Sequence, residues 1–227
     1  MKKVILIYGA PGAGKGTQAD LLSKKMGFYH FDTGKYIEQT INDPDNSKNK
    51  KFQKEKEIFD SGKLNTPSWV LKDVVIKNTK KFARAGIRIV FSGSPRTLFE
   101  AFGDDKNKGL IEILEKLYGR ENLGILYIDI KPESSIFRNS NRLVCSVCAT
   151  PVLFQEGSGI TVCPICSAPL KKRVFDNPEK LKVRLEEYKN RTYPILEELK
   201  KRGYKIDTID GEPAPFKVFE EVKNKIS

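Results

Sequence analysis

A glycine-rich stretch near the amino terminus constrains the fold of this chain more than any other feature. It follows the apolar run Val4-Ile5-Leu6-Ile7-Tyr8 and reads Gly9-Ala10-Pro11-Gly12-Ala13-Gly14-Lys15-Gly16-Thr17. The apolar run predicts a strand over residues 2–9 that is buried on both faces, and residues 14–26 predict a helix that Gly27 ends. A glycine loop between a buried strand and a helix points successive backbone N–H groups at one centre, which suits a phosphate group.

Two further features of this loop favour the phosphates of a nucleotide. The helix start carries a partial positive charge, and Lys15 supplies a mobile cation for the outer phosphates. The usual pattern places Ser or Thr directly after the Lys, whereas here Gly16 intervenes and Thr17 carries the hydroxyl. An ordinary glycine-rich turn is the alternative, but the strand before the loop and the helix after it favour the phosphate site.

Four more short apolar segments predict strands, and helical segments alternate with them. The strand segments are 27–32, 87–91, 123–130 and 204–209. A long helical segment over 178–202 contains Pro194, which should kink it or split it in two. Because strands and helices alternate, the sequence predicts an α/β fold with a parallel sheet and helices on both faces.

The net charge indicates a polyanionic ligand but does not identify which one. The 227 residues include 41 Lys+Arg and 29 Asp+Glu, a net charge of +12, which suits any polyanionic ligand from a small nucleotide to a nucleic acid. The longest apolar run is far too short for a membrane span, and no small-residue cleavage site follows it. We therefore expect a cytoplasmic protein with no membrane partner.

Four cysteines form two pairs with the same internal spacing. They are Cys145, Cys148, Cys163 and Cys166, and 14 residues separate the pairs. Two Cys-x2-Cys turns at this separation are typical of a tetrahedral zinc site with four thiolate ligands, which leaves no position for catalysis. The sequence therefore predicts a structural zinc ion in a small β module, with two disulfides or redox-active pairs as alternatives.

The glycine loop, with its late Thr17, resembles the loop of adenylate kinases and related nucleoside monophosphate kinases. The likeness continues in the family's order through Asp32-Thr33-Gly34, Gly62-Lys63-Leu64, Gly93-Ser94-Pro95-Arg96-Thr97, Asn141-Arg142 and Asp210-Gly211. It covers essentially the whole chain.

The resemblance implies a fold, a division into domains and a reaction. The fold is a P-loop core with a five-stranded parallel sheet, a small helical insertion that binds the monophosphate, and a zinc-bearing β lid. The core would take residues 1–31, 66–138 and 177–227, the insertion 32–65, and the lid 139–176. The reaction is reversible transfer of the γ-phosphoryl group of Mg·ATP to a nucleoside monophosphate, with AMP as the expected acceptor. The resemblance also implies a monomer.

The resemblance also implies which residues bind and react. For ATP they are Gly12, Ala13, Gly14, Lys15, Gly16, Thr17, Arg138 and Arg142. For the monophosphate they are Thr33, Gly34, Lys63, Asn65, Gly93, Arg96, Glu100, Arg173 and Arg184. The catalytic set is Lys15, Arg96, Arg142, Arg173 and Arg184, because phosphoryl transfer needs alignment and charge neutralisation more than a protein base.

Two inferences about the arginines come from spacing alone. Arg184 lies on the apolar stripe of the long helical segment, three residues after Leu181, and a charge on a buried face requires an anion or an internal carboxylate. Arg138 and Arg142 are four apart and would share one face if both are helical.

The sequence departs from the family pattern mainly on the monophosphate side. Glu38 stands where an Arg is usual, and Lys35, in place of an Asp, could supply the missing charge. Ser92 and Phe175 each replace an Asp of the family pattern. Glu100 replaces a Gln that reads adenine in the family. An ionised Glu only accepts hydrogen bonds, so it suits the donors of guanine or cytosine better than adenine. The alternative is that Glu100 turns outward and does not contact the base.

The sequence leaves one alternative function from a class other than kinases. The net charge and the paired cysteines also fit a zinc-ribbon protein that binds nucleic acid and uses ATP as a switch. Against it, the arginines fall at phosphate-binding landmarks, and aromatic residues do not alternate with basic ones. We also expect His30, the one histidine, to be a solvated or hydrogen-bonded residue without a role in the reaction.

Overall fold

The structure is a computed structural model of the 227-residue chain. It describes residues 1–148, 150–152, 159–172 and 177–226. Arg173, Phe175 and Asp176 lie outside the described residues, so the roles expected of Arg173 and Phe175 stay predictions.

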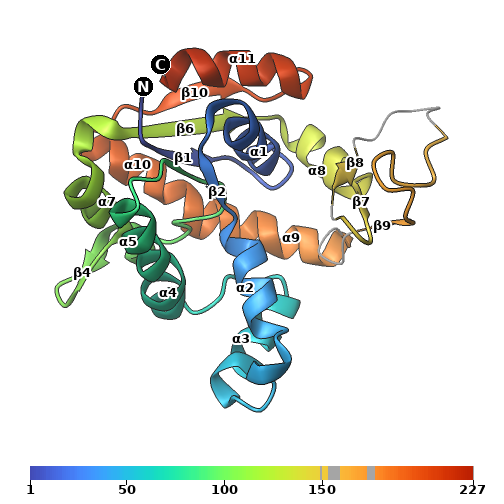
Figure 1. Cartoon of the computed structure of the whole chain (residues 1–227), viewed down its shortest axis with the longest axis horizontal. Helices are drawn as coiled ribbons and strands as arrows, with labels where there is room; N and C mark the ends of the chain where they lie inside the picture. Colours follow the sequence, from blue (N-terminus) through green and yellow to red (C-terminus); the bar gives the residue numbers. More distant parts are fainter. Residues whose placement is uncertain (149, 153–158, 173–176, 227) are drawn as a thin grey trace.

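A five-stranded parallel sheet forms the centre of the molecule (Figure 1). Its strands are β1 (Val4–Tyr8), β2 (Tyr29–Phe31), β3 (Ile89–Phe91), β6 (Leu123–Asp129) and β10 (Asp207–Asp210), in the order β10-β6-β1-β3-β2. Every neighbouring pair is parallel, which confirms the predicted fold class. The strand predicted from residue 204 starts later, at Asp207, because the N–H of Tyr204 still bonds the Leu199 carbonyl at the end of a helix.

Strand β1 divides the core into two layers by its alternation. Val4, Leu6 and Tyr8 pack in one hydrophobic cluster, whereas Ile5 and Ile7 pack in the other. The second cluster includes α1 (Lys15–Met26) and α11 (Pro215–Ile226), and the first includes the helices of the opposite face, which Figure 1 shows below the sheet. Both faces are therefore covered, as an all-parallel sheet requires.

The remaining elements between β2 and β6 fall into three groups. Helix α2 (Thr33–Ile41), the 3-10 turn η1 (Pro44–Asn46) and α3 (Lys50–Asp60) form a projection at the bottom of Figure 1. Helix α4 (Pro67–Trp69), the π-helical segment η2 (Val70–Ile76) and α5 (Lys77–Arg84) run on without a break. After β3 come α6 (Leu98–Phe102), the hairpin β4 (Gly103–Asp104) and β5 (Asn107–Lys108), α7 (Leu110–Tyr118) and the turn η3 (Arg120–Asn122).

The long helical segment near the carboxyl terminus is interrupted where Pro194 predicts it. It consists of α9 (Pro178–Glu187), the π-helical segment η5 (Tyr188–Thr192) and α10 (Tyr193–Lys201). Pro194 has no N–H for the carbonyl four residues earlier, so the turn before it widens. The helix therefore changes geometry without ending.

A small antiparallel sheet follows α8 (Pro132–Ser140) and carries the cysteines. Its strands are β7 (Leu143–Cys145), β8 (Pro151–Val152) and β9 (Leu170–Lys172), in the order β8-β7-β9. It lies at the side of the molecule, away from α11, in Figure 1. Among the described helices, none is long and apolar enough to cross a membrane.

Candidate active site

The glycine loop between β1 and α1 has the backbone geometry of an anion cradle. Gly12 and Gly14 adopt the left-handed region, with φ of 85° and 89°. A Cβ added at Gly12 would lie 2.5 Å from Nδ2 of Asn139, whereas one added at Gly14 or Gly16 would meet nothing within 4 Å. The loop is thus packed behind Gly12 and open in front of Gly14 and Gly16.

The loop provides two kinds of positive group, backbone N–H donors and the Lys15 ammonium. Helix α1 has no side-chain cap at Gly14, so the N–H groups of its first turn remain available to an anion. Lys15 donates from Nζ to the carbonyl oxygens of Gly9 (2.8 Å) and Ala10 (2.9 Å). Burial, followed by the positive charges of Arg96, Arg184 and Arg142, lowers the pKa of Lys15 to about 7. A phosphate placed here would relieve that repulsion.

Helix α8 supports the loop from behind through residues that the sequence analysis did not identify. Ser135 donates from Oγ to the Pro11 carbonyl at 2.6 Å, and both Ser135 and Asn139 are buried. Asn139 donates to the Ser135 carbonyl (2.7 Å) and accepts from Nη2 of Arg142 (3.0 Å). The close approach of Asn139 to Gly12 is the reason for the glycine there. No local motif marks these residues, because their contacts with the loop join positions more than 120 residues apart in the chain.

The structure separates the two arginines that follow β6. Arg138 lies on α8 and donates to the carbonyls of Gly211 and Glu212, both at 2.9 Å. Arg142 lies beyond the helix, whose C-cap is Asn141, so the condition for a shared helical face, that both arginines are helical, is not met. Arg142 instead reaches back over the end of α8 to Asn139, in range of Lys15.

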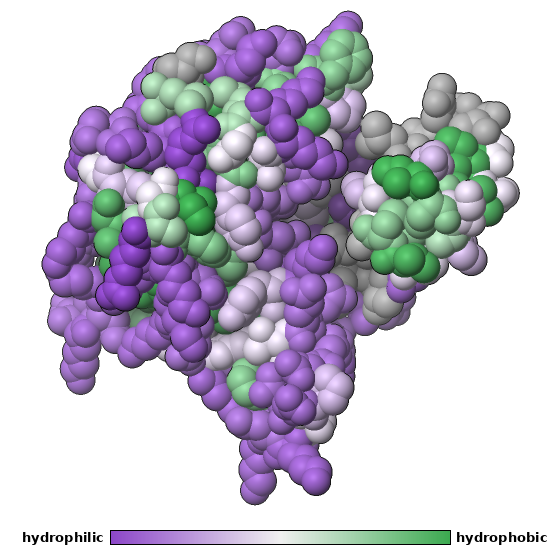
Figure 2. Space-filling view, viewed as in Figure 1, coloured by the Kyte–Doolittle hydropathy of each residue, from purple (hydrophilic) through white to green (hydrophobic). Residues whose placement is uncertain are grey.

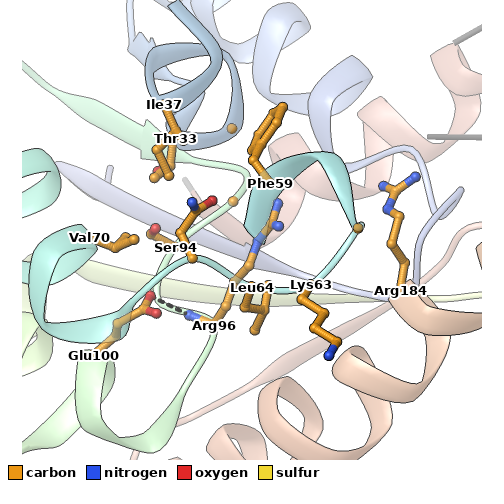
Figure 3. A pocket seen from close by; sticks show the side chains of 14 residues that line it. Thr33, Ile37, Phe59, Lys63, Leu64, Val70, Ser94, Arg96, Glu100 and Arg184 are labelled. Carbon is orange, nitrogen blue, oxygen red and sulfur yellow. Dashed lines mark hydrogen bonds between the residues drawn. The ribbon is translucent and has the colours of Figure 1, made fainter. Parts of the chain in front are cut away.

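A pocket beside the loop brings together most residues expected to bind the monophosphate (Figure 3). It is lined by Thr33, Gly34, Ile37, Phe59, Gly62, Lys63, Leu64, Asn65, Val70, Gly93, Ser94, Arg96, Glu100 and Arg184. Eight of the nine expected residues are in this set, and the ninth, Arg173, lies outside the described residues. The lining comes from α2, α3, the loop before α4, η2, the loop after β3, α6 and α9.

The pocket differs in chemistry from end to end. In Figure 3, Val70 and Glu100 lie at one end, Arg184 lies at the other, and Arg96 extends between them. The hydroxyl groups of Thr33 and Ser94 in the lining are buried and have no hydrogen-bond partner among the described residues. Buried hydroxyl groups are normally satisfied, so these two fit a ligand that supplies the partner. A ligand with an anionic end and a polar planar end matches this arrangement.

Glu100 turns into the pocket, so the alternative that it points outward is wrong. It is 3% exposed, and its Oε2 accepts from the N–H of Arg96 at 2.9 Å (Figure 3). Its Oε1 lies 3.3 Å from Oγ1 of Thr97. Burial raises the pKa of Glu100 to about 7, although the Arg96 N–H and the charges of Arg96 and Arg191 act in the opposite direction. The carboxyl group can therefore be neutral or ionised near neutral pH.

The other departures that the structure describes, Glu38, Lys35 and Ser92, lie outside the pocket lining. Glu38 and Lys35 are on α2 but do not line the pocket, whereas Lys63 does, so nothing in this geometry favours Lys35 as the replacement charge. Ser92 is buried at the end of β3, and its Oγ lies 2.7 Å from Nε2 of His30.

His30 is a hydrogen-bonded residue, as expected, and it connects two elements. Its Nδ1 lies 2.7 Å from Oδ1 of Asp20 on α1, while its Nε2 faces Ser92 after β3. This hydrogen bond to His30 is the largest cause that lowers the pKa of Asp20. An ionised Asp20 accepts from Nδ1–H, and Nε2 shares a hydrogen bond with the Ser92 hydroxyl.

The four cysteine sulfurs form a cluster at the small sheet. They lie within 4.8 Å of one another, with 3.4 Å between Cys145 and Cys166 and 3.6 Å between Cys148 and Cys163. All four are free thiols, so the two-disulfide alternative is wrong. Backbone N–H groups of Val147 and Ile165 donate to the sulfurs of Cys145 and Cys163. About 3.8 Å between sulfurs is what tetrahedral bonds of ~2.3 Å to zinc require, so the cluster could hold a metal ion.

Comparisons with known proteins agree with this geometry. Residues 7–204 match the family model described as adenylate kinase. A protein named adenylate kinase from Mycoplasma mycoides is 31% identical over 98% of this chain and 98% of its own length. Proteins of the same name from Chlamydia trachomatis serovar D and Ruminiclostridium cellulolyticum are 28% and 32% identical, over 98% and 91% of this chain and 89% and 91% of their own lengths.

Proposed function

The chain belongs to the adenylate kinase family and is a nucleoside monophosphate kinase, and from this premise we propose that its acceptor is AMP and its product ADP. One observation supports the proposal most. Arg96 and Arg184 line the acceptor pocket, and with Arg142 they act on Lys15 of the glycine loop. Two phosphate sites are therefore near enough for one group of cations to serve both.

Different residues bind the two nucleotides in this proposal. We assign the β- and γ-phosphates of ATP to the loop amides of residues 12–17, to Lys15 and to Arg142, with Arg138 nearby at the Gly211 carbonyl. We assign the phosphate of AMP to Arg96 and Arg184, and its base to the end of the pocket that holds Glu100.

Magnesium supplies further charge neutralisation when it is bound with ATP. The oxygen ligands that it prefers are present beside the loop. The Thr17 hydroxyl lies in the first turn of α1, and the Asp32 carboxylate is close enough to Lys15 to act on its pKa. These two residues would face the ion or its bound waters.

The transfer itself needs no protein base. An oxygen of the AMP phosphate attacks the γ-phosphorus, and the bond from that phosphorus to the β-phosphate oxygen breaks, which leaves two ADP. The chain holds donor and acceptor in line and neutralises the charge that spreads over the transferred group. We propose that residues 32–65 and 139–176 close over the site to exclude water, with Arg173 reaching the transferred group. Helix α3 and the small sheet belong to these two segments.

Steady-state kinetics with a nucleotide panel test the proposal. ATP is paired in turn with AMP, GMP, CMP and UMP, and diphosphate formation is measured together with ATP loss. We expect AMP to give the highest kcat/KM at pH 6.5, with two ADP formed per ATP consumed. If ATP is consumed but no monophosphate is converted to its diphosphate, phosphoryl transfer to a monophosphate is contradicted.

A second acceptor is supported by the burial of Glu100. When ionised, its carboxylate only accepts hydrogen bonds, which matches the N1–H and N2–H2 donors of guanine or the amine of cytosine. When protonated, it presents one donor and one acceptor, as the amide of a Gln does, and matches adenine. Because the pKa of Glu100 is raised to about 7, both forms are available to the enzyme.

We further propose that the cysteine cluster holds zinc in a structural role. The support is the distance between the sulfurs and the backbone donors aimed at them. Free thiols in this arrangement also fit a cytoplasmic setting. Metal analysis should find one zinc per chain, and a chelator should lower the thermal midpoint of the native protein but not that of a Cys148→Ser variant already free of metal. A metal content near zero in protein purified without chelators would contradict the proposal.

A further inference from the structure

A second cavity shares no lining residue with the acceptor pocket. It is a groove of about 630 Å³ bounded by η2, α5, α7 and the β4–β5 hairpin. We call it the basic groove, because six of the ten residues that line it are cations: Lys72, Lys80, Arg84, Lys106, Lys108 and Lys116. No carboxylate is among its lining residues, and none of these residues lines the acceptor pocket.

The cations stand on both walls of the basic groove. Lys72, Lys80 and Arg84 follow one stripe of the continuous helix η2–α5, at intervals of eight and four residues, with Ile76 in the gap. Lys106 and Lys108 come from the hairpin, and Lys116 comes from α7. All six side chains are exposed, so they meet an entering ligand without a conformational change.

Few of these charges are neutralised within the protein. Among the described residues, only Lys108 of the six forms an ion pair, with Glu112 on α7. Lys72 acts on the exposed Asp104 carboxylate at longer range. Holding five cations around one concavity raises the local positive potential, which a polyvalent anion would lower.

The floor of the basic groove is aliphatic. Ile76 contributes from η2, and Ile113 and Leu117, four apart, contribute from α7, with Leu117 37% exposed. No aromatic side chain lines the groove, so it lacks the stacking surface that single-stranded nucleic acids use. Figure 2 shows the same pattern on the side of α5, α7 and β4, where hydrophilic side chains surround smaller hydrophobic areas.

We propose that the basic groove binds a polyphosphate, a small molecule with several linked phosphates, at a site separate from the two substrate sites. The volume is that of a site for one small molecule, and the number of cations matches several phosphate charges. The phosphates can belong to a nucleotide or to an inorganic chain. Of these two sources, the aliphatic floor favours the nucleotide, whose sugar and base can rest there.

The test measures binding stoichiometry with the full chain. Inorganic tripolyphosphate and ATP are titrated calorimetrically into three proteins: wild type, K72E/K80E/K116E, and the matched control K3E/K217E/K225E. The control lysines are exposed, form no ion pair among the described residues and produce the same change in net charge. The single tryptophan, Trp69, lies three residues before Lys72 and provides a second signal by fluorescence.

We expect two equivalents of tripolyphosphate on wild type and on the control, and one on the groove variant, with affinity for the lost site reduced at least tenfold. A Lys15→Ala variant should keep the groove equivalent, so a failed kinase proposal and a failed groove proposal give different results. If K72E/K80E/K116E is poorly folded by circular dichroism, K72Q/K80Q/K116Q replaces it. ATP that binds the groove more tightly than tripolyphosphate assigns the source to a nucleotide, and the reverse order assigns it to the inorganic chain.

Three outcomes would overturn the proposal. One is a single equivalent on all proteins. Another is an equal loss on the groove variant and the control, which would mean general charge attraction. The third is a single-stranded oligonucleotide that binds through these lysines more tightly than either polyphosphate, which would make the groove a nucleic-acid surface.

Discussion

The two proposed substrate sites of this enzyme differ in the groups that form them, backbone amides in one and side chains in the other. The glycine loop, to which we assign ATP, is a backbone site: its donors are the amides of one continuous loop, shaped by glycines and supported from behind by α8. The acceptor side is a side-chain site, whose lining comes from seven separate segments of the chain. A backbone site depends on few residue identities, whereas a side-chain site changes its selectivity with each substitution. Among the described residues, the one departure from the family pattern that lines this pocket is Glu100, on the side-chain site.

Replacement of Lys15 should have the largest effect, because it removes the one mobile cation of the backbone site. For Lys15→Ala we expect kcat to fall by about 10²–10³, the usual cost of losing a charge that stabilises the transition state. Lys24→Ala, an exposed lysine on the same helix, should change kcat less than twofold. Coupled assays of ADP formation measure both. A drop below tenfold for Lys15→Ala would mean that the loop amides alone carry the site.

Replacement of Arg184 should separate the two sites. For Arg184→Ala we expect kcat/KM for the monophosphate to fall by about 10–10², because a charged hydrogen bond to phosphate is lost, with KM for ATP nearly unchanged. The control is Lys182→Ala, an exposed cation two residues earlier on α9. If KM for ATP rises as much as KM for the acceptor, the two sites are not separable in the way that their geometry indicates.

The Glu100 carboxyl should make acceptor choice depend on pH. Its pKa is about 7, so at pH 6 it is mostly protonated and at pH 8 mostly ionised, in contact with Arg96 and Thr97 and near Arg191 and Tyr8. We expect the AMP-to-GMP ratio of kcat/KM to fall by up to about a hundredfold between pH 6 and pH 8, and to stay flat in Glu100→Gln. A flat ratio in the wild type would remove Glu100 from base selection.

Stability provides an independent check on the same group. A carboxyl whose pKa is raised on folding destabilises the native state above its unfolded pKa of 4.5, and the loss grows until pH passes about 7. Glu100→Gln should therefore gain stability over wild type as pH rises from 4.5 to 8, by an amount on the order of 3 kcal/mol. Urea unfolding at pH 5 and pH 8 measures the difference. Equal gains at both pH values would contradict the raised pKa.

The contrast between backbone and side chains also decides what the sequence could predict. The strand–loop–helix unit around Lys15 is local, so its motif predicted both the element boundaries and the open cradle. The alternation of strands and helices predicted the parallel sheet. The missing N–H of Pro194 predicted the interruption of the long helical segment. The family resemblance implies that Glu100 is at the monophosphate site but leaves an outward orientation open, and the structure turns it inward. The hydrogen bonds of Ser135 and Asn139 behind the loop and the link from Asp20 through His30 to Ser92 could not be predicted. Each depends on contacts between distant segments whose residues are common polar types.

The smallest expected effect concerns the side-chain support of the backbone site. Ser135→Ala removes the 2.6 Å hydrogen bond to the Pro11 carbonyl and leaves that buried acceptor without its donor, which costs about 1–3 kcal/mol. We expect a lower thermal midpoint and a rise of about twofold to fivefold in KM for ATP, with KM for the acceptor unchanged. Ser140→Ala, at the end of the same helix, is the control and should leave both constants as they are. If the acceptor constant rises instead, α8 supports the side-chain site as well, and the division between the two sites is less sharp than their construction indicates.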